Sequence, residues 1–323
     1  MATLGAAKIT PAALVKPARD VPGVEVTAVA ARNPDRARAF AAKHGIPRVL
    51  DSYEAVIEDP DVDAVYNPLP NGLHGRWTLA ALAAGKHVLC EKPFTANRDE
   101  AVKVAAAAAH SDRAVMEAFH WRYHPLAQRM LDVIGSGTLG SVSRIETKIC
   151  FPLPMRKDIR YQLDLAGGAT MDAGCYAIHI LRTLAGTEPR VLSAQAKLMS
   201  PGVDRAMTAE MAFSDGRTGA ITCSMWSTRI LSLKVTVTGD RGRMDVLNPL
   251  APHRFNRLTI RSPQNKTSER VRGDPTYTYQ LRAFDAAVRD GTPALTGPDD
   301  AVANMAVIDD VYRAAGLEPR PAS

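Results

Sequence analysis

Cysteines are scarce in this chain, and so are aromatic residues and long hydrophobic runs. The four cysteines are widely separated and form no CxxC pair: Cys90, Cys150, Cys175 and Cys223. Their spacing indicates neither a zinc site nor a disulfide framework, so we expect no metal. No apolar run approaches the roughly 20 residues that span a bilayer, and no charged segment followed by an apolar one marks a secretory leader. These absences favour a reduced, cytoplasmic protein with no membrane partner.

Neither sign of charge dominates a long stretch of the sequence. The 323 residues include 40 Lys and Arg interleaved with 34 Asp and Glu, which gives a net charge of +6. No basic helix or aromatic platform typical of a nucleic-acid binder is present, so we expect no nucleic-acid partner. A mildly positive surface would instead attract an anionic small molecule such as a phosphorylated cofactor.

Short apolar runs alternate with helical stretches in the first third of the chain. The candidate strands are residues 1–4, 24–30, 48–50, 64–66, 87–90 and 114–118. Thr10, Asn33 and Asn97 each precede a helical stretch and are candidate N-caps. Strands separated by helices predict an α/β fold, a doubly wound parallel sheet of the Rossmann type, over residues 1–118.

The pattern changes after residue 118, where longer strands are joined by tight turns. Strands are predicted at 208–213, 219–225, 233–238 and 243–246, and helices at 125–134, 173–185, 278–289 and 299–314. Hairpin turns predict antiparallel pairing. We therefore expect a C-terminal α+β domain with a large, open, mainly antiparallel sheet over residues 119–323, ending in a frayed tail at 319–323.

The loop after the first strand is a candidate cofactor site. It keeps only the first glycine of the dinucleotide fingerprint G-x-G-x-x-G, because Ala7 and Thr10 occupy the other two places. Such a signal is weak alone, but the loop lies between a strand and a helix, where a pyrophosphate meets helix N–H groups. We expect a dinucleotide to contact Gly5, Ala6, Ala7, Lys8 and Ile9.

The end of the second strand predicts which dinucleotide is bound. A cofactor without a 2′-phosphate usually meets an Asp or Glu about 20 residues beyond the glycines, and no acid follows Ala30 and Ala31. Arg32, with Asn33 and Arg36 behind it, would bind the additional phosphate. We therefore predict NADP, with NAD less favoured; the alternative is that Arg32 is only a surface residue on the approach to a helix.

Two further segments follow strands of the parallel sheet at the edge where ligands bind. The strand at 87–90 ends in Glu91-Lys92-Pro93, and a carboxylate, an amine and a helix-breaking ring make a poor core. The strand before it ends in a rigid loop that is either a simple turn or a wall of the cofactor pocket. The residues concerned in this loop are Asn67, Pro68, Leu69, Asn71 and His74.

A second candidate site follows the glycine pair at 167–168. Asp172, Tyr176 and His179 have the spacing i, i+4 and i+7, so they share one face of a predicted helix. The alternative is a capping Asp, a half-buried Tyr and a His with its hydrogen bonds satisfied. Arg160 and Tyr161 precede the glycine pair and are candidate substrate contacts.

Two of these segments resemble the Gfo/Idh/MocA oxidoreductases. Glu91-Lys92-Pro93 is similar to the Glu-Lys-Pro signature of that family, and residues 166–176 are similar to its G-G-G-x-x-x-D-x-G-x-[HY] motif, with Ala166 in place of the first glycine. The resemblance extends over essentially the whole chain. Tyr176 at the last motif position is typical of glucose–fructose oxidoreductase, dimeric dihydrodiol dehydrogenase and NADP-dependent xylose dehydrogenase, and argues against the inositol dehydrogenases.

The resemblance implies roles for individual residues. Lys92 would lie beside the nicotinamide ring, often next to a cis peptide bond to Pro93, and would lower the pKa of the Tyr176 phenol from its usual value of about 10. Tyr176 would move the proton and Asp172 would orient the substrate, with His179 as a rival proton shuttle. The remaining contacts implied are Asn67, Pro68, Leu69, Asn71, His74, Glu91, Trp121 and Arg122 to the cofactor, and Tyr123, Arg160, Tyr161 and His179 to the substrate.

These expectations combine into one function and one alternative. The function is an NADP-dependent dehydrogenase or reductase that moves a hydride between the nicotinamide and a hydroxyl or carbonyl carbon of a sugar, cyclic polyol or trans-diol. The alternative is a catalytically weak NADP-binding sensor or scaffold of the same fold, which Lys92, Asp172 and Tyr176 argue against. The resemblance also implies a homodimer or homotetramer formed through the C-terminal sheet.

Overall fold

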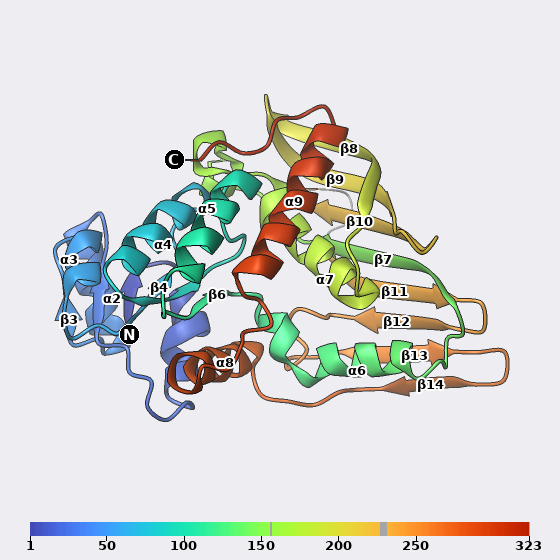
Figure 1. Ribbon diagram of the computed structural model, residues 1–323, viewed down its shortest axis with the longest axis horizontal. Helices are drawn as coiled ribbons and strands as arrows, with labels where there is room; N and C mark the ends of the chain where they lie inside the picture. Colours follow the sequence, from blue (N-terminus) through green and yellow to red (C-terminus); the bar gives the residue numbers. More distant parts are fainter. Residues whose placement is uncertain (156, 227–230, 323) are drawn as a thin grey trace. The chain divides into compact units, whose positions relative to one another are not determined.

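The computed structural model in Figure 1 describes residues 1–155, 157–226 and 231–322. Contacts along the chain divide them into two compact units. Unit 1 comprises Met1–Tyr123 and Tyr277–Val302 together with Ala322, and unit 2 comprises His124–Thr276 and Ala303–Pro321. A single division at residue 118 would instead assign Tyr277–Val302 to the second domain.

Unit 1 is built on a six-stranded sheet in which every neighbouring pair of strands is parallel. The strand order is β3-β2-β1-β4-β5-β6, which is the order of a Rossmann sheet, and it reverses between β1 and β4. The predicted doubly wound fold is confirmed. The strands are β1 Ala2–Leu4, β2 Ala28–Ala30, β3 Arg48–Val49, β4 Ala64–Asn67, β5 His87–Cys90 and β6 Val115–Glu117.

Local sequence signals explain where two helices of unit 1, α2 and α5, begin. Asn33 accepts a hydrogen bond from the backbone of Arg36 at 3.0 Å, and Asn97 does the same for Glu100, so both predicted caps are confirmed. The cap predicted at Thr10 is wrong, because its side chain makes no capping hydrogen bond. The helices are η1 Pro11–Val15, α1 Lys16–Ala18, α2 Pro34–His44, α3 Tyr53–Glu58, η2 Asn71–Leu73, α4 His74–Ala83, α5 Arg98–Ala109, η3 His120–Tyr123 and α8 Thr276–Asp290.

Unit 2 is built on an eight-stranded sheet with the order β14-β13-β12-β11-β7-β10-β9-β8. All pairs are antiparallel except β7 with β10, so the predicted mainly antiparallel sheet is confirmed. The strands are β7 Val142–Cys150, β8 Arg190–Ser200, β9 Val203–Ala212, β10 Thr218–Ser224, β11 Ser232–Gly239, β12 Arg243–Leu247, β13 Arg257–Arg261 and β14 Lys266–Glu269.

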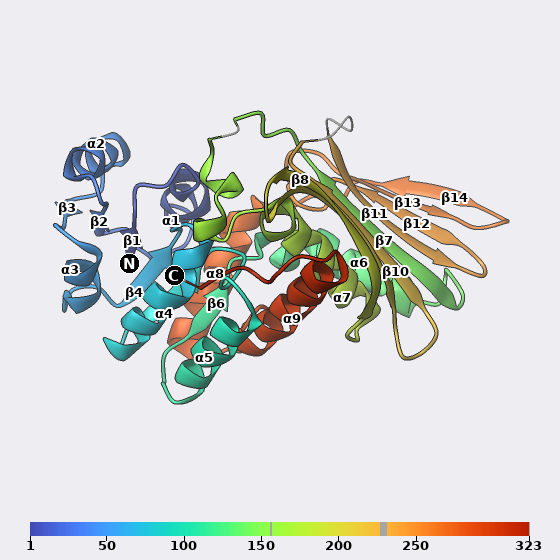
Figure 2. The same ribbon diagram turned by 90° about the horizontal axis from the view of Figure 1, so that it is seen from above.

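The two faces of this sheet differ in chemistry. Ile145, Thr147 and Ile149 of β7 are buried, and the Thr147 hydroxyl donates to the Ala177 carbonyl of helix α7 Cys175–Ala185. The remaining helices that include residues of unit 2 are α6 Pro125–Gly135 and α9 Pro298–Ala314, and Figure 2 shows α6 and α7 lying along one face of the sheet. Because side chains alternate along a strand, the intervening residues of β7 point to the opposite face.

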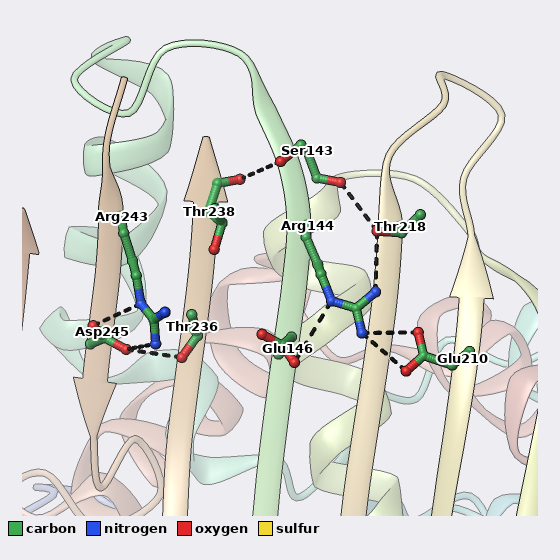
Figure 3. A network of polar contacts seen from close by, with 9 residues as sticks. All are labelled: Ser143, Arg144, Glu146, Glu210, Thr218, Thr236, Thr238, Arg243 and Asp245. Carbon is green, nitrogen blue, oxygen red and sulfur yellow. Dashed lines mark hydrogen bonds and ion pairs between the residues drawn. The ribbon is translucent and has the colours of Figure 1, made fainter. Parts of the chain in front are cut away.

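Charged side chains satisfy one another on that opposite face, as Figure 3 shows. Arg144 donates to both carboxylate oxygens of Glu210, at 3.0 and 2.9 Å. The Asp245 Oδ1 atom lies 3.0 Å from Lys234 Nζ and 2.9 Å from Arg243 Nη2, and the carboxylate also pairs with Arg261. Burial raises the pKa of Asp245, but hydrogen bonds from these cations outweigh it and hold the pKa well below its usual range. The charged face is therefore a network of ion pairs within the sheet.

The candidate catalytic helix of unit 2 begins earlier than predicted. A π-helical turn, η6 Thr170–Gly174, continues into α7 Cys175–Ala185. Ahead of it, a Cβ atom on Gly167 would lie 2.7 Å from the Arg160 carbonyl, and the Gly168 amide donates to that carbonyl at 2.8 Å. The glycine pair thus lets the backbone at Arg160 approach the start of the helix. The 3₁₀ turns of this approach are η4 Ile159–Tyr161 and η5 Leu163–Leu165.

Candidate active site

The fingerprint loop follows β1 and turns through a glycine. Gly5 is buried with φ of +101°, and a Cβ atom there would lie 3.3 Å from the Leu69 side chain. Its amide donates to the Ala30 carbonyl at 2.7 Å, and the Ala6 carbonyl accepts from Arg36 at 2.8 Å. The loop is therefore tied to the end of β2, where the predicted phosphate-binding residues lie.

Two buried polar atoms near this edge of the sheet fit a polar ligand. The Thr10 hydroxyl, at the third fingerprint place, and the Asn67 amide oxygen, at the end of β4, have no hydrogen-bond partner among the described residues. Both residues are fully buried. Buried polar groups normally have partners, and a bound dinucleotide is one group that would supply them here. Arg32 and Lys8 are exposed beside the same loops.

His74 connects the loops that follow β4 and β5. Its Nδ1 lies 2.7 Å from the Pro93 carbonyl and its Nε2 lies 2.7 Å from the Leu69 carbonyl. Burial lowers the pKa of His74 to about 4, against the opposing effect of these carbonyls. The ring is therefore neutral at pH 7, with one N–H to donate. Because both nitrogens face backbone carbonyls, its contact with a cofactor stays a prediction.

Glu91 anchors the turn that carries Lys92. It is buried, accepts a hydrogen bond from the Tyr66 hydroxyl at 2.8 Å, and accepts one from the Lys92 amide at 3.3 Å. The Lys92–Pro93 peptide bond is cis, as the family resemblance implied. Lys92 itself is half-buried at the carboxyl end of β5. The structure thus gives Glu91 a supporting role in the turn, while its contact with the cofactor stays a prediction.

The aromatic and basic segment after β6 lies largely in the interior of unit 1. Trp121 is 1% exposed, and burial lowers the pKa of the half-buried Arg122. The Tyr123 hydroxyl lies 2.8 Å from the Thr296 hydroxyl and accepts from the Thr296 amide at 3.2 Å. Burial raises the pKa of Tyr123 to about 12. Its hydroxyl is therefore a neutral group with partners inside unit 1, and its contact with a substrate stays a prediction.

In unit 2 the structure brings Arg160 and Asp172 together. The Arg160 Nε lies 3.1 Å from the Asp172 carboxylate, and its Nη1 lies 3.1 Å from Asp158. Asp172 raises the pKa of Arg160. Tyr161 donates to the Leu153 carbonyl at 3.1 Å; burial, then Asp158 and Asp172, raise its pKa to about 12. These residues form one polar group at the start of the catalytic helix.

Tyr176 and His179 lie further along the same helix and are both buried. Since η6 is π-helical, its wide turn changes the angular spacing between Asp172 and Tyr176 from that of a regular α-helix. Short π-helical segments within helices are frequent at functional sites. The assignment of Tyr176 as the proton-transfer residue and His179 as its rival stays a prediction.

Sequence reasoning missed two features of this region. Asp158 caps η4 by accepting from the Arg160 amide at 3.0 Å, and only the two-residue spacing of Asp158 and Arg160 could have indicated this turn. A cavity of about 250 Å³ is lined by Leu198, Met199, Arg205 and Trp226. Its walls come from three strand ends that no local pattern connects, so the sequence carried no signal for it.

Neither a metal centre nor a membrane span is found in the described part of the chain. No three His, Cys, Asp or Glu side chains are grouped there so as to hold an ion. Its helices also include none that combines the length and hydropathy needed to cross a bilayer.

The class of protein follows from the fold and from the strand-end residues. A Rossmann sheet with a glycine turn after β1 and a lysine at the end of β5 is typical of an oxidoreductase that uses a nicotinamide dinucleotide. Residues 1–119 match the model of an oxidoreductase family with an NAD-binding Rossmann fold. Residues 127–245 match the Gfo/Idh/MocA C-terminal domain. The chain belongs to the Gfo/Idh/MocA oxidoreductase family, as its two motifs predicted.

Individual relatives agree with this assignment. The chain is 36% identical over 292 residues to D-xylose 1-dehydrogenase (NADP(+)) 2 of Haloferax volcanii, covering 90% of each chain. It is 34% identical to trans-1,2-dihydrobenzene-1,2-diol dehydrogenase of Sus scrofa, over 70% of this chain and 67% of that protein. A 3-ketoreductase from Actinomadura kijaniata, solved in complex with NADP and TDP-benzene, matches with a TM-score of 0.90 at 28% identity, covering 97% and 96%. The chain is thus an enzyme of a family of dehydrogenases and reductases.

The lowered pKa of His74 predicts a pH dependence of stability. Between pH 6.5 and about 4 the unfolded chain binds a proton on this imidazole that the folded chain does not. The neutral His74 ring therefore contributes fully to the free energy of unfolding above pH 6.5, and this contribution is lost as the pH falls toward 4. The free energy of unfolding should differ by roughly 3 kcal/mol between the two ends of this range. Urea unfolding of wild type and His74→Gln between pH 4 and 7 should show the smaller pH slope in the variant.

The exposed His110 supplies the control for this measurement. His110→Gln should keep the wild-type slope, because the His110 side chain is exposed at the end of α5. Parallel stability curves for wild type and His74→Gln would contradict the assignment.

Proposed function

We propose that the protein is an NADP-dependent oxidoreductase acting on a hydroxyl or carbonyl carbon of a sugar, cyclic polyol or trans-diol. The observation that carries the proposal is the polar group of Arg160 and Asp172 at the start of the helix that bears Tyr176. The relatives named above as acting on D-xylose and on a dihydrodiol support this substrate class. The alternative, a weakly catalytic NADP-binding sensor, has no observation in its favour.

The charge of the Asp172 group favours a neutral substrate. One guanidinium, that of Arg160, is shared between the carboxylates of Asp158 and Asp172, so this group has a formal charge of −1. A carboxylate accepts hydrogen bonds from substrate hydroxyls, and the net negative charge disfavours an anionic group nearby. A polyhydroxylated small molecule fits this chemistry.

The proposed chemistry assigns the proton transfers to Tyr176. The bound nicotinamide accepts or supplies the hydride. In oxidation Tyr176 takes the proton from the substrate hydroxyl, and in reduction it returns a proton to the carbonyl oxygen. An ammonium such as that of Lys92 stabilises negative charge that develops on a substrate oxygen. Asp172 holds the substrate hydroxyls in place.

The residues at the end of β2 support the choice of NADP. Arg32 is exposed there, no acid is present, and Arg36 is fixed to the Ala6 carbonyl of the fingerprint loop. An exposed guanidinium binds a 2′-phosphate bidentately, whereas a ribose 2′-hydroxyl needs an acid for recognition. Two of the compared proteins are named with NADP.

We also propose that copies of the chain associate through the charged face of the unit 2 sheet, as a homodimer or homotetramer. Helices α6 and α7 lie on the other face of this sheet. Exposed Thr208 of β9 comes two residues before Glu210, so its side chain points to the charged face. The cysteines of the chain are buried and free, which agrees with a reducing, cytoplasmic location.

The cofactor assignment predicts a selective effect of Arg32→Ala. The KM for NADP should rise by roughly 10- to 100-fold, because charge-assisted hydrogen bonds to the phosphate are lost. The KM for NAD should change by less than about twofold, since NAD has no 2′-phosphate. Arg38→Ala is the matched control, because Arg38 pairs with Asp35 on the exposed surface of helix α2, which follows Arg32. A wild-type enzyme with a clear preference for NAD would refute the assignment.

The proton-transfer assignment predicts different pH profiles for two tyrosine variants. Tyr176→Phe should lower kcat by roughly 10²- to 10⁴-fold and remove the pH-dependent limb of the profile. Tyr161→Phe should keep the limb, because the pKa of Tyr161 is about 12 and its hydroxyl stays protonated through the assay range. Steady-state kinetics from pH 6 to about 10, with aldoses, inositols and trans-diols as substrates, measure both. Activity that survives Tyr176→Phe and is lost in His179→Ala would reverse the roles.

The association proposal predicts that Thr208→Arg lowers the molar mass in solution. Wild type should sediment at two or four times the chain mass of 34.8 kDa, and a bulky cation on the charged face should shift it toward monomer. Ala42→Arg, at an exposed position of α2, should leave the mass unchanged. A monomeric wild type at micromolar concentration would be incompatible with the proposal.

A further inference from the structure

Asp204 of β9 is a fully buried carboxylate whose two oxygens are both occupied. One oxygen accepts from the Thr170 amide at 2.8 Å and from the Thr170 hydroxyl at 2.7 Å. The other accepts from the Tyr312 hydroxyl and from Arg320 Nη2, each at 3.0 Å. All of these residues belong to unit 2. We call this set, Asp204 with Thr170, Tyr312 and Arg320, the Asp204 cluster.

The cluster caps the helix that carries the candidate catalytic residues. The N-cap position of η6 is Ala169, which has no side-chain acceptor. The first amides of a helix need acceptors from elsewhere, and negative charge is favoured at a helix N-terminus. Asp204 supplies both from a strand 34 residues further along the chain. Asp172 lies two residues after the capped Thr170, within the same π-helical turn.

Arg320 holds Asp204 in place from the C-terminal segment. Its side chain is 1% exposed, lies 3.9 Å from the centre of the Tyr312 ring and donates to the Gly202 carbonyl at 2.8 Å. The prediction of a frayed tail is therefore wrong at Arg320. Its guanidinium balances the buried carboxylate, which would otherwise have no counter-charge.

The second glycine of the pair at 167–168 is explained by the same cluster. Gly168 has φ of +137°, and a Cβ atom there would lie 2.2 Å from Asp204 Oδ1 and 2.8 Å from the Tyr312 hydroxyl. Any larger residue would displace the carboxylate. The motif thus requires glycine at this place to admit Asp204, in addition to any requirement of the substrate.

We propose that Asp204 and Arg320 are positioning residues, which set the place of Asp172 and Tyr176 through the start of their helix. This inference rests on the proposed function. Neither residue touches Asp172 in the contacts described above; they act through Thr170 and the first helical turn. Displacement of a reacting group by about 1 Å can lower a rate by roughly 10²-fold, so loss of the cap should affect kcat more than substrate or cofactor binding.

The test compares two ends of one helix. Asp204→Asn and the milder Tyr312→Phe weaken the cap. Arg182→Lys weakens contacts at the far end of α7, where the buried Arg182 binds the exposed Glu188 at 2.6 and 2.8 Å and Asn304 at 3.3 Å. We expect Asp204→Asn to lower kcat by roughly 10²-fold with the KM for NADP within about twofold, and Tyr312→Phe to be intermediate. Arg182→Lys should lower the melting temperature but leave kcat within about twofold.

Rescue and hydrogen exchange complete the test. Arg320→Lys keeps the counter-charge and should retain more activity than Arg320→Ala. Hydrogen exchange should quicken at the amides of residues 170–176 in Asp204→Asn, and near residue 182 in Arg182→Lys. Unchanged exchange at 170–176, or equal kcat losses in Asp204→Asn and Arg182→Lys, would overturn the proposal. A wild type that turns over none of the substrates would instead refute the proposed function, and the exchange measurement would still decide the positioning.

Discussion

The parallel pairing of β4 with β5 determines where the cofactor side of unit 1 is built. The register sets Asn67 beside Cys90, so the loops that leave both strands emerge at the same edge of the sheet. The His74 ring lies between a backbone carbonyl of each loop and donates its one N–H to one of them, and Glu91 fixes the turn before Pro93. Ligands bind at the carboxyl edge of a sheet of this kind. The contacts of buried His74 and Glu91 hold the loops of that edge in a defined shape.

Unit 2 relies on close backbone approach more than on strand register. The glycine pair permits the Arg160 backbone and the Asp204 carboxylate both to reach the start of the catalytic helix. One approach places a guanidinium beside Asp172, and the other supplies the cap. The missing side chains of Gly167 and Gly168 therefore leave room for a backbone carbonyl and a carboxylate beside the helix. The two glycines thus matter for the electrostatics of the helix start as well as for its packing.

Much of the fold was predictable because its signals are local. The strand at 87–90, the caps at Asn33 and Asn97 and the helices of unit 2 follow from neighbouring residues, and the Glu-Lys-Pro triplet and glycine motif identified the family. The strands β8 and β14 were missed because their residues are exposed or half-buried and lack a clear apolar alternation; β7 and β13 were not predicted either. Asp204 and Arg320 were missed because their roles depend on contacts more than 100 residues apart, which periodicity does not encode.

The division of the chain has a consequence for its synthesis. The core of unit 1 combines Leu14, Tyr66 and Leu89 with Leu281 and Phe284 of α8, so residues from both ends of the sequence complete one hydrophobic interior. Domains form as units while the chain emerges from the ribosome. The Rossmann strands therefore leave the ribosome with part of their apolar surface uncovered, and it stays uncovered while some 150 residues of unit 2 are made. Molecular chaperones have their longest opportunity to bind this protein during that interval.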